Sequence, residues 1–173
     1  SESQELLELF AALLRISEVE AGTLRRDFSD LSMTELVEDM MDSYHPDFEI
    51  SGHHMSSTLM RDLHLHGDPR LLRQLVANLL DNALRHTPPG TWVSISLSSE
   101  DDFLQLCIRD DGPGVPAGDI PRLLDRFSRS EASRSTNGHG LGLALVSAVA
   151  RMHGGSATIL PGAGFGVEVR LPH

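Results

Sequence analysis

The 173-residue chain contains no lysine, and this absence excludes several kinds of enzyme. It can have no P-loop lysine, no Schiff-base lysine and no strand lysine of the eukaryotic protein-kinase type. The single cysteine, Cys107, excludes a disulfide framework and any multi-cysteine zinc site. No apolar run approaches the roughly 20 residues of a membrane span, and no signal-peptide pattern is present. We therefore expect a soluble, cytoplasmic chain from a reducing compartment, and leave open whether a longer parent protein is membrane-anchored.

Acidic residues are in excess, and they are concentrated in the first part of the chain. The formal net charge is −11. Residues 1–50 carry 13 acidic side chains against three arginines, whereas residues 51–173 carry 12 against 11. A chain with this balance repels nucleic acid and anionic lipid, so we expect no nucleic-acid partner. Its length and 40% apolar content are typical of one globular domain with a short appendage.

The spacing of apolar residues and the capping signals predict an α+β protein. An amphipathic helix is expected over residues 3–21, and its apolar face suits either the core of this chain or a bundle with a partner chain. Ser32 and Glu35 form a capping box for a second helix that reaches about Tyr44. The other expected elements are strands around 48–51 and 63–66, a helix from Asp68 to about His86, strands over 91–98 and 103–110, a helix near 141–152, and strands near 156–160 and 166–171. This order favours a sheet with helices on one face.

The helix that starts at Asp68 carries a line of polar side chains beside its apolar face. Asn78, Asn82 and Arg85 stand at positions i, i+4 and i+7 among leucines. An unpaired buried amide costs about 1–3 kcal/mol, so these side chains need partners. They could cap a neighbouring loop, but two amides and an arginine on one line favour a ligand-facing role.

Two glycine-containing segments suggest a binding site. Asp110 ends an alternating strand just before Gly112 and Gly114, so its carboxylate is expected at the floor of a cleft, where it can accept a hydrogen bond from an exocyclic amine. An ordinary Asp-Gly turn is the alternative. The Gly-x-Gly-x-Gly run over 138–142 places bare backbone amides at the start of the last helix, which predicts an anion site, with a flexible hinge as the alternative. Its spacing and the preceding polar loop exclude a Rossmann motif.

The stretch between these two segments, residues 115–137, lacks a clear apolar rhythm. A stretch of this length inside a compact domain is more often functional than idle. We interpret it as a mobile lid that carries cations at Arg126, Arg129 and Arg134 and one hydrophobic anchor, Phe127.

Together, the order and spacing of these segments resemble the catalytic ATP-binding domain of sensor histidine kinases, in the superfamily that includes type II topoisomerase and mismatch-repair ATPases. The resemblance covers nearly the whole chain, since residues 13–22 are similar to the end of the second helix of the dimerisation hairpin. The other matching segments are an asparagine box over 78–87, a first glycine box over 110–114, a phenylalanine box over 124–129, a second glycine box over 138–142 and a closing strand over 164–172.

The resemblance implies a Bergerat-type two-layer α/β sandwich, with a mixed, mostly antiparallel sheet, that binds ATP and Mg²⁺. Asp110 would read the adenine amino group, Asn82 with Asn78 would supply oxygen ligands to Mg²⁺, and Arg85 would replace the usual lysine and meet a phosphate. The implied catalytic residues are Asn78, Asn82 and Arg85. The implied nucleotide-binding residues are Asn78, Asn82, Arg85, His86, Asp110, Gly112, Gly114, Val115, Phe127, Arg129, Gly138, His139, Gly140, Leu141 and Gly142.

The implied reaction is transfer of the γ-phosphoryl group of ATP to a histidine of the dimerisation hairpin, for relay to a response regulator, in a full-length homodimer. No histidine here lies in the family's acceptor motif, because neither His45 nor His86 is followed by an acidic residue. We therefore expect no phosphoacceptor in this chain. The expected organisation is the hairpin end over 1–22, a linker over 23–30 and the catalytic domain over 31–173.

Two other functions are compatible with these motifs. The chain could be a nucleotide-binding regulatory module without turnover, or an ATPase of the same superfamily. Those ATPases usually carry Glu where this chain has Asn78, and an amide cannot act as a general base. Phe165 stands where the family often has Thr. The paired histidines His53–His54 and His64–His66 are expected at the surface or sheet edge, in preference to a metal site.

Overall fold

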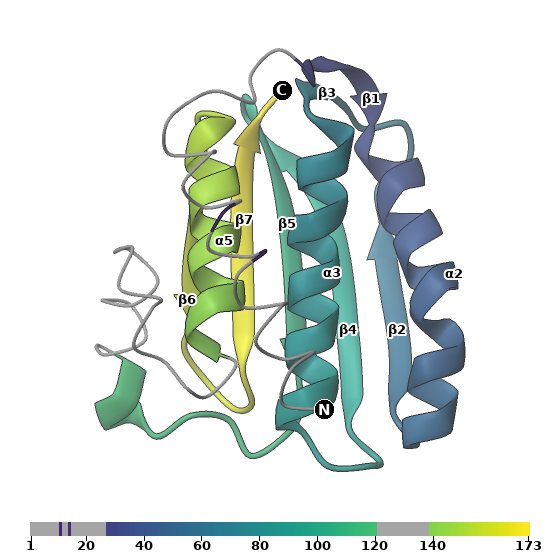
Figure 1. Ribbon diagram of the computed structural model, residues 1–173, viewed down its shortest axis with the longest axis vertical. Helices are drawn as coiled ribbons and strands as arrows, with labels where there is room; N and C mark the ends of the chain where they lie inside the picture. Colours follow the sequence, from purple (N-terminus) through teal and green to yellow (C-terminus); the bar gives the residue numbers. More distant parts are fainter. Residues whose placement is uncertain (1–10, 12–13, 15–26, 121–138) are drawn as a thin grey trace.

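The computed structural model describes residues 27–120 and 139–173, together with residues 11 and 14, and its elements form two layers (Figure 1). Side chains of residues 117 and 139–141 are outside the description. The elements are β1 (Ser29–Ser32), α2 (Met33–Ser51), β2 (His54–Leu59), β3 (His64–Gly67), α3 (Pro69–His86), β4 (Trp92–Glu100), β5 (Phe103–Asp110), the short 3₁₀ helix η2 (Ala117–Asp119), α5 (His139–Met152), β6 (Ser156–Leu160) and β7 (Gly166–Pro172).

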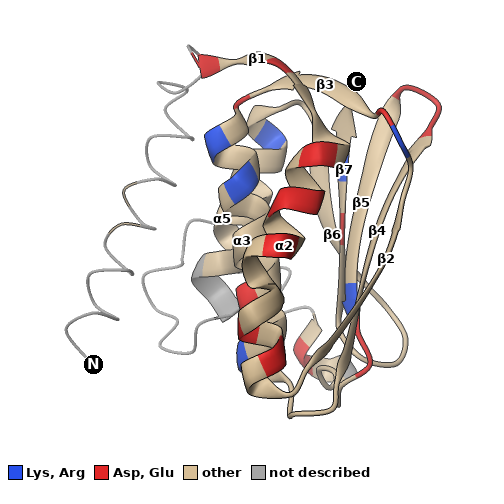
Figure 2. Cartoon of the chain, turned by 90° about the vertical axis from the view of Figure 1, so that its right-hand side faces the viewer, with Lys and Arg blue, Asp and Glu red and all other residues tan. Residues whose placement is uncertain are grey.

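A five-stranded sheet forms one layer, and α2, α3 and α5 cover one of its faces (Figure 2). The strand order is β2-β4-β5-β7-β6, in which only the β2–β4 pair is parallel. A separate antiparallel pair joins β1 to β3. This arrangement confirms the expected α/β sandwich with a mixed, mostly antiparallel sheet. β1 begins at Ser29, so it overlaps the end of the expected linker.

The α3 helix begins and ends where the sequence predicts. Asp68 is its N-cap, and Oδ1 of this residue accepts hydrogen bonds from the backbone N–H groups of Arg70 and Leu71 at 2.9 and 3.2 Å. Pro69 occupies the first helical position, where the missing N–H costs nothing. The rotation of α3 is set by its apolar stripe, which faces the sheet.

The α2 helix corrects the sequence prediction at its C-terminal end. Its start is as expected, with Ser32 accepting a hydrogen bond from the backbone N–H of Glu35 at 3.2 Å. It continues through Pro46 to Ser51, so the strand predicted around 48–51 is wrong. The physical reason is Phe48, which is 1% exposed and anchors the last turn in the core. Burial of this ring outweighs the hydrogen bond that a proline removes from a helix interior.

Two strands were not predicted at all. Both β1 and β2 lie at the margins of their sheets, and most of their side chains are exposed. Neither sequence therefore shows the clean alternation that marks a half-buried strand. Their strand conformation depends on pairing with β3 and β4, which lie farther along the chain.

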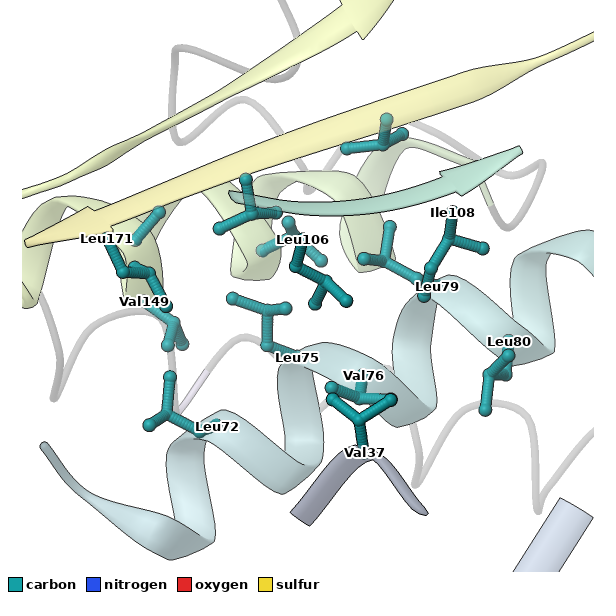
Figure 3. Close-up of a cluster of buried hydrophobic side chains, with 14 of the residues drawn as sticks. Val37, Leu72, Leu75, Val76, Leu79, Leu80, Leu106, Ile108, Val149 and Leu171 are labelled. Carbon is teal, nitrogen blue, oxygen red and sulfur yellow. The ribbon is translucent and has the colours of Figure 1, made fainter. Parts of the chain in front are cut away.

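The core lies between α3 and the sheet (Figure 3). Leu72, Leu75 and Val76 of α3 are 0% exposed, as is Leu106 of β5. Figure 3 also shows Leu79 of α3 close to Ile108 of β5. Burial of each such side chain contributes about 1.5–3 kcal/mol, so this seam fixes the position of α3 against β5.

None of the helices in the described ranges combines the length and the hydrophobicity that crossing a membrane requires.

Candidate functional site

A small cavity lies where α3 meets the ends of β5 and β7. Its volume is about 10 Å³. The lining residues are Leu79, Asn82, Ala83, Ile108, Asp110, Phe165 and Val167. Asn82 and Asp110 supply the polar side chains of this lining, and the remainder is apolar. The structure therefore brings together two of the predicted site residues that stand on different elements.

Asp110 is buried at the last position of β5. It is 6% exposed, and its Oδ1 accepts hydrogen bonds from the backbone N–H groups of Gly112 at 3.0 Å and Phe165 at 3.3 Å. Burial raises the pKa of this carboxyl, and the two backbone hydrogen bonds act in the opposite direction. Both hydrogen bonds fall on Oδ1, which leaves Oδ2 with capacity for a ligand.

The glycines around Asp110 allow the backbone over 110–114 to touch the backbone at Gly164. Gly114 has φ +70° and Gly164 has φ +75°, a region that side-chain-bearing residues rarely adopt. A Cβ on Gly114 would lie 2.8 Å from the backbone oxygen of Gly164, and a Cβ on Gly164 would overlap the backbone oxygen of Asp110. Gly112 is equally close to its surroundings, since a Cβ there would lie 2.9 Å from Cγ2 of Thr87. These glycines therefore allow two segments of this chain to approach each other closely, in addition to the predicted approach of a ligand.

The two asparagines continue the site along α3 toward α5. Both are half-buried, and Oδ1 of Asn78 accepts a hydrogen bond from Nε2 of Gln74 at 2.9 Å. A Cβ on Gly142 would lie 3.9 Å from Cβ of Asn78, so the first turn of α5 faces this residue. The line predicted from the sequence therefore runs from the N-terminus of α5 at Asn78 to the cavity at Asn82.

Arg85 and His86 lie at the last turn of α3. Arg85 is exposed and His86 is half-buried. Burial lowers the pKa of His86, and the positive charge of Arg85 lowers it further, so both effects favour the neutral imidazole. Where α2 packs on α3, burial first and Asp81 second raise the pKa of Tyr44, whose hydroxyl donates to the backbone oxygen of Ala77 at 3.4 Å.

Several predicted site residues cannot be placed in this geometry. Phe127, Arg129 and Gly138 lie outside the described residues, as does most of the stretch interpreted as a lid. Gly140, Leu141 and Gly142 belong to the first turn of α5, which starts at His139, although the side chains of 139–141 are not described. Val115 is half-buried and packs against the core.

Sequence reasoning missed the aromatic wall of the cavity. Phe165 is 9% exposed and both lines the cavity and donates its backbone N–H to Asp110. The signal available was its place directly after Gly164, at the start of the segment similar to the family's closing strand. Among the histidines expected at the surface or sheet edge, His54 is exposed but His53 is buried. His153 is buried as well. No group of three or more His, Cys, Asp or Glu suited to a metal ion occurs among the residues that the structure describes.

Comparison with known proteins identifies the family of this chain. Residues 67–173 match the family described as histidine kinase-, DNA gyrase B- and HSP90-like ATPase. The sensor histidine kinase TrcS of Mycobacterium tuberculosis is 44% identical over 115 residues, which cover 62% of this chain and 23% of that protein. The signal transduction histidine-protein kinase AfsQ2 of Streptomyces coelicolor is 32% identical over 99% of this chain and 31% of its own length.

A solved structure of a histidine kinase has the same fold. The Acinetobacter baumannii histidine kinase AdeS aligns with a TM-score of 0.79 at 23% identity, over 98% of this chain and 79% of that chain. The fold and the site thus define an ATP-binding α/β domain of the Bergerat type. The chain belongs to the histidine kinase-, DNA gyrase B- and HSP90-like ATPase family, and within it resembles the catalytic domains of sensor histidine kinases. It spans about a quarter to a third of the length of these two curated relatives.

Proposed function

We propose that this chain is the phosphoryl-donating half of a sensor histidine kinase, which binds ATP with Mg²⁺ and transfers the γ-phosphoryl group to a histidine of a dimerisation hairpin. The observation that carries the proposal is the shared cavity of Asn82 and Asp110. A carboxylate that reads a base and an amide that faces the phosphates must lie within the length of one nucleotide. Membership of an ATP-binding family supports the same assignment.

Asp110 is the residue proposed to select adenine. Oδ2 would accept a hydrogen bond from the exocyclic amino group, while Oδ1 stays bonded to the backbone N–H groups of Gly112 and Phe165. A guanine would present an oxygen at this place, which leaves a buried carboxylate without a donor. Sites that hydrogen-bond one substrate group can reject an analogue lacking it by about 10⁴-fold. The apolar walls of the cavity suit the faces of a flat ring.

The cavity volume of about 10 Å³ is far smaller than a purine ring. Adenine binding therefore requires the walls to move apart. Residues 111–116, which follow β5 and belong to no helix or strand, are the candidates for this movement. The α3 side of the cavity is fixed by the leucine seam described above.

Asn82 and Asn78 are proposed to face the phosphates. Their amide oxygens form the kind of donor set that Mg²⁺ accepts, since this hard cation binds oxygen and usually keeps waters beside one or two protein ligands and the substrate phosphates. The hydrogen bond from Gln74 to Asn78 holds that amide in one orientation. When bound, the cation would offset charge on the phosphate oxygens.

The remaining phosphate contacts are proposed at the two helix ends that meet there. The first turn of α5 offers the backbone N–H groups of Gly140, Leu141 and Gly142, with Gly138 just before it, and a helix N-terminus attracts anions. Arg85 would contact a phosphate, and neutral His86 would lie near the ribose or the phosphates. Phe127 and Arg129 are assigned to a closing lid by resemblance.

In the proposed transfer, the bond between the γ-phosphorus and the bridging oxygen of ATP breaks, and a bond to a histidine nitrogen forms as ADP leaves. Positioning and electrostatics supply most of such catalysis. Asn78 has no basic group to take a proton from water, so this site favours transfer over hydrolysis. The acceptor hairpin, its dimeric partner and a response regulator are proposed partners, with residues 1–22 as the end of the hairpin, 23–30 as a linker and 31–173 as the donor domain.

The test is label transfer from γ-labelled ATP with Mg²⁺ to a separately supplied dimerisation hairpin of the parent protein. We expect label on the hairpin and none on this chain alone. Label on this chain without a hairpin would contradict the assignment as a donor. Tight nucleotide binding without transfer to the hairpin would instead support a regulatory module, and release of phosphate without labelled protein would support an ATPase.

A further inference from the structure

His53 joins the C-terminal ends of α2 and α3, and the site described above does not use it. Its side chain is buried, with the whole residue 7% exposed. Nδ1 lies 2.8 Å from Oγ of Ser51, in the last turn of α2. Nε2 lies 2.8 Å from Oγ1 and 3.2 Å from the backbone oxygen of Thr87, the cap of α3. Both helices end toward the lower edge of Figure 1.

The two hydroxyls that contact His53 also hydrogen-bond to the ends of their own helices. The hydroxyl of Ser51 lies 2.8 Å from the backbone oxygen of Asp47 and 3.2 Å from that of Phe48. The hydroxyl of Thr87 lies 2.6 Å from the backbone oxygen of Ala83. Each hydroxyl thus links the ring of His53 to the backbone near the end of its helix.

We propose that His53 is a positioning residue for the nucleotide site, whose two ring nitrogens hydrogen-bond to Ser51 and Thr87 at once and so clamp α2 to α3. The contact with Ser51 holds the last turn of α2, and the contact with Thr87 holds the cap of α3.

Thr87 connects His53 to the residues that line the cavity. The hydroxyl of Thr87 holds the backbone of Ala83, which lines the cavity. The methyl group of Thr87 abuts Gly112, where a Cβ would lie 2.9 Å from it, and Gly112 donates its backbone N–H to Oδ1 of Asp110. His53 therefore fixes the end of α3 relative to the loop that orients the carboxylate. This inference rests on the proposed nucleotide site.

The first experiment detects the clamp without any nucleotide. In ¹⁵N spectra of the full chain, we expect both ring nitrogens of His53 to show the shifts of hydrogen-bonded nitrogens, with the signals assigned by their loss in His53→Gln. A ring nitrogen without a hydrogen bond would overturn the proposal. This outcome is independent of ATP binding, so it is informative even if the proposed function is wrong.

The second experiment measures the coupling to the site. Affinity for a non-hydrolysable ATP analogue is measured for wild type, His53→Gln, Thr87→Val and the double variant. We expect each single variant to weaken binding about five- to tenfold, and the double variant to weaken it no further, because the two residues act through one contact. His54→Gln is the matched control, since this neighbouring histidine is exposed and stacks on Trp92, and we expect a change of less than about twofold.

The outcomes separate the two claims. Wild-type binding with unchanged affinity in His53→Gln would overturn the positioning role and leave the proposed function intact. No binding by wild type would refute the proposed function, whereas the ring-nitrogen spectra would still decide the clamp. Thermal unfolding of each variant in parallel shows whether a weakened variant remains folded, and additive losses in the double variant would contradict a shared contact.

Discussion

Replacing Asp110 by Asn is expected to separate nucleotide binding from folding. The amide oxygen of Asn can take the place of Oδ1 and keep the hydrogen bonds from Gly112 and Phe165. The amide nitrogen then takes the place of Oδ2, where it presents a donor to the adenine amino group, which is also a donor. We therefore expect the fold to be preserved and the contact proposed to select adenine to become repulsive.

The size of the loss follows from the kind of bond that is removed. A hydrogen bond to a charged group contributes about 1.5–3 kcal/mol, and each 1.4 kcal/mol is a factor of ten in affinity. We therefore expect Asp110→Asn to weaken binding of an ATP analogue roughly 10- to 150-fold in isothermal calorimetry. Asp111→Asn is the matched control, because this neighbouring carboxylate is exposed and accepts the backbone N–H of Trp92 at 2.8 Å. Near-normal affinity of Asp110→Asn would refute the assignment.

The Asp110→Asn substitution is also expected to affect the stability of the folded protein. Burial raises the pKa of Asp110 above its ordinary value of 3.8, so the folded protein holds this proton more tightly than the unfolded chain. The associated stability is present below pH 3.8 and is lost as the pH rises through the raised pKa. At neutral pH we therefore expect Asp110→Asn to be at least as stable as wild type. A variant that loses both binding and stability at neutral pH would contradict this account of the carboxylate.

Three further predictions concern the scaffold. In urea unfolding, Gly164→Ala should lower the free energy of unfolding by more than about 2 kcal/mol, because its Cβ would overlap a backbone oxygen. Gly90→Ala is the control: it lies at φ +92° with open space around it, and it should lower the free energy of unfolding by only about 1 kcal/mol. Burial lowers the pKa of His153, whose Nε2 accepts a backbone N–H at 3.1 Å. Stability should thus fall as the pH drops below about 6.5 through that lowered pKa, and His153→Gln should flatten this dependence in thermal melts. Leu75→Ala should lower the free energy of unfolding, measured by chemical denaturation, by about 2–5 kcal/mol, because Leu75 is 0% exposed. A decrease of less than about 1 kcal/mol would contradict the core described.

Local signals were enough to predict much of the scaffold. The caps at Ser32 and Asp68, together with the apolar stripe that follows Pro69, located the starts of α2 and α3. Strict alternation over 103–110 located β5 with its correct ends. These signals succeed because caps and alternation depend on residues a few positions apart, so the chain encodes them without reference to the rest of the fold.

The errors fall where distant contacts override local preference. The sequence around Pro46 indicates the end of a helix, but the helix continues because Phe48 is buried against other elements. The edge strand β2 is polar on both faces, and its conformation comes from pairing with β4. Both outcomes are set by partners that lie far along the chain, which local patterns do not contain.

For the candidate site as well, some features follow from local sequence patterns and others only from tertiary contacts. Asn78, Asn82 and Asp110 were predicted as site residues from helical spacing and from a strand that ends in an acidic residue, because residue type and period are properties of the sequence. That Asn82 and Asp110 share a cavity was decided by the leucine seam that positions α3 on β5. The wall formed by Phe165 and the junction at His53 also arose only from tertiary structure, since burial and hydrogen-bond partners depend on which distant backbones converge on a side chain.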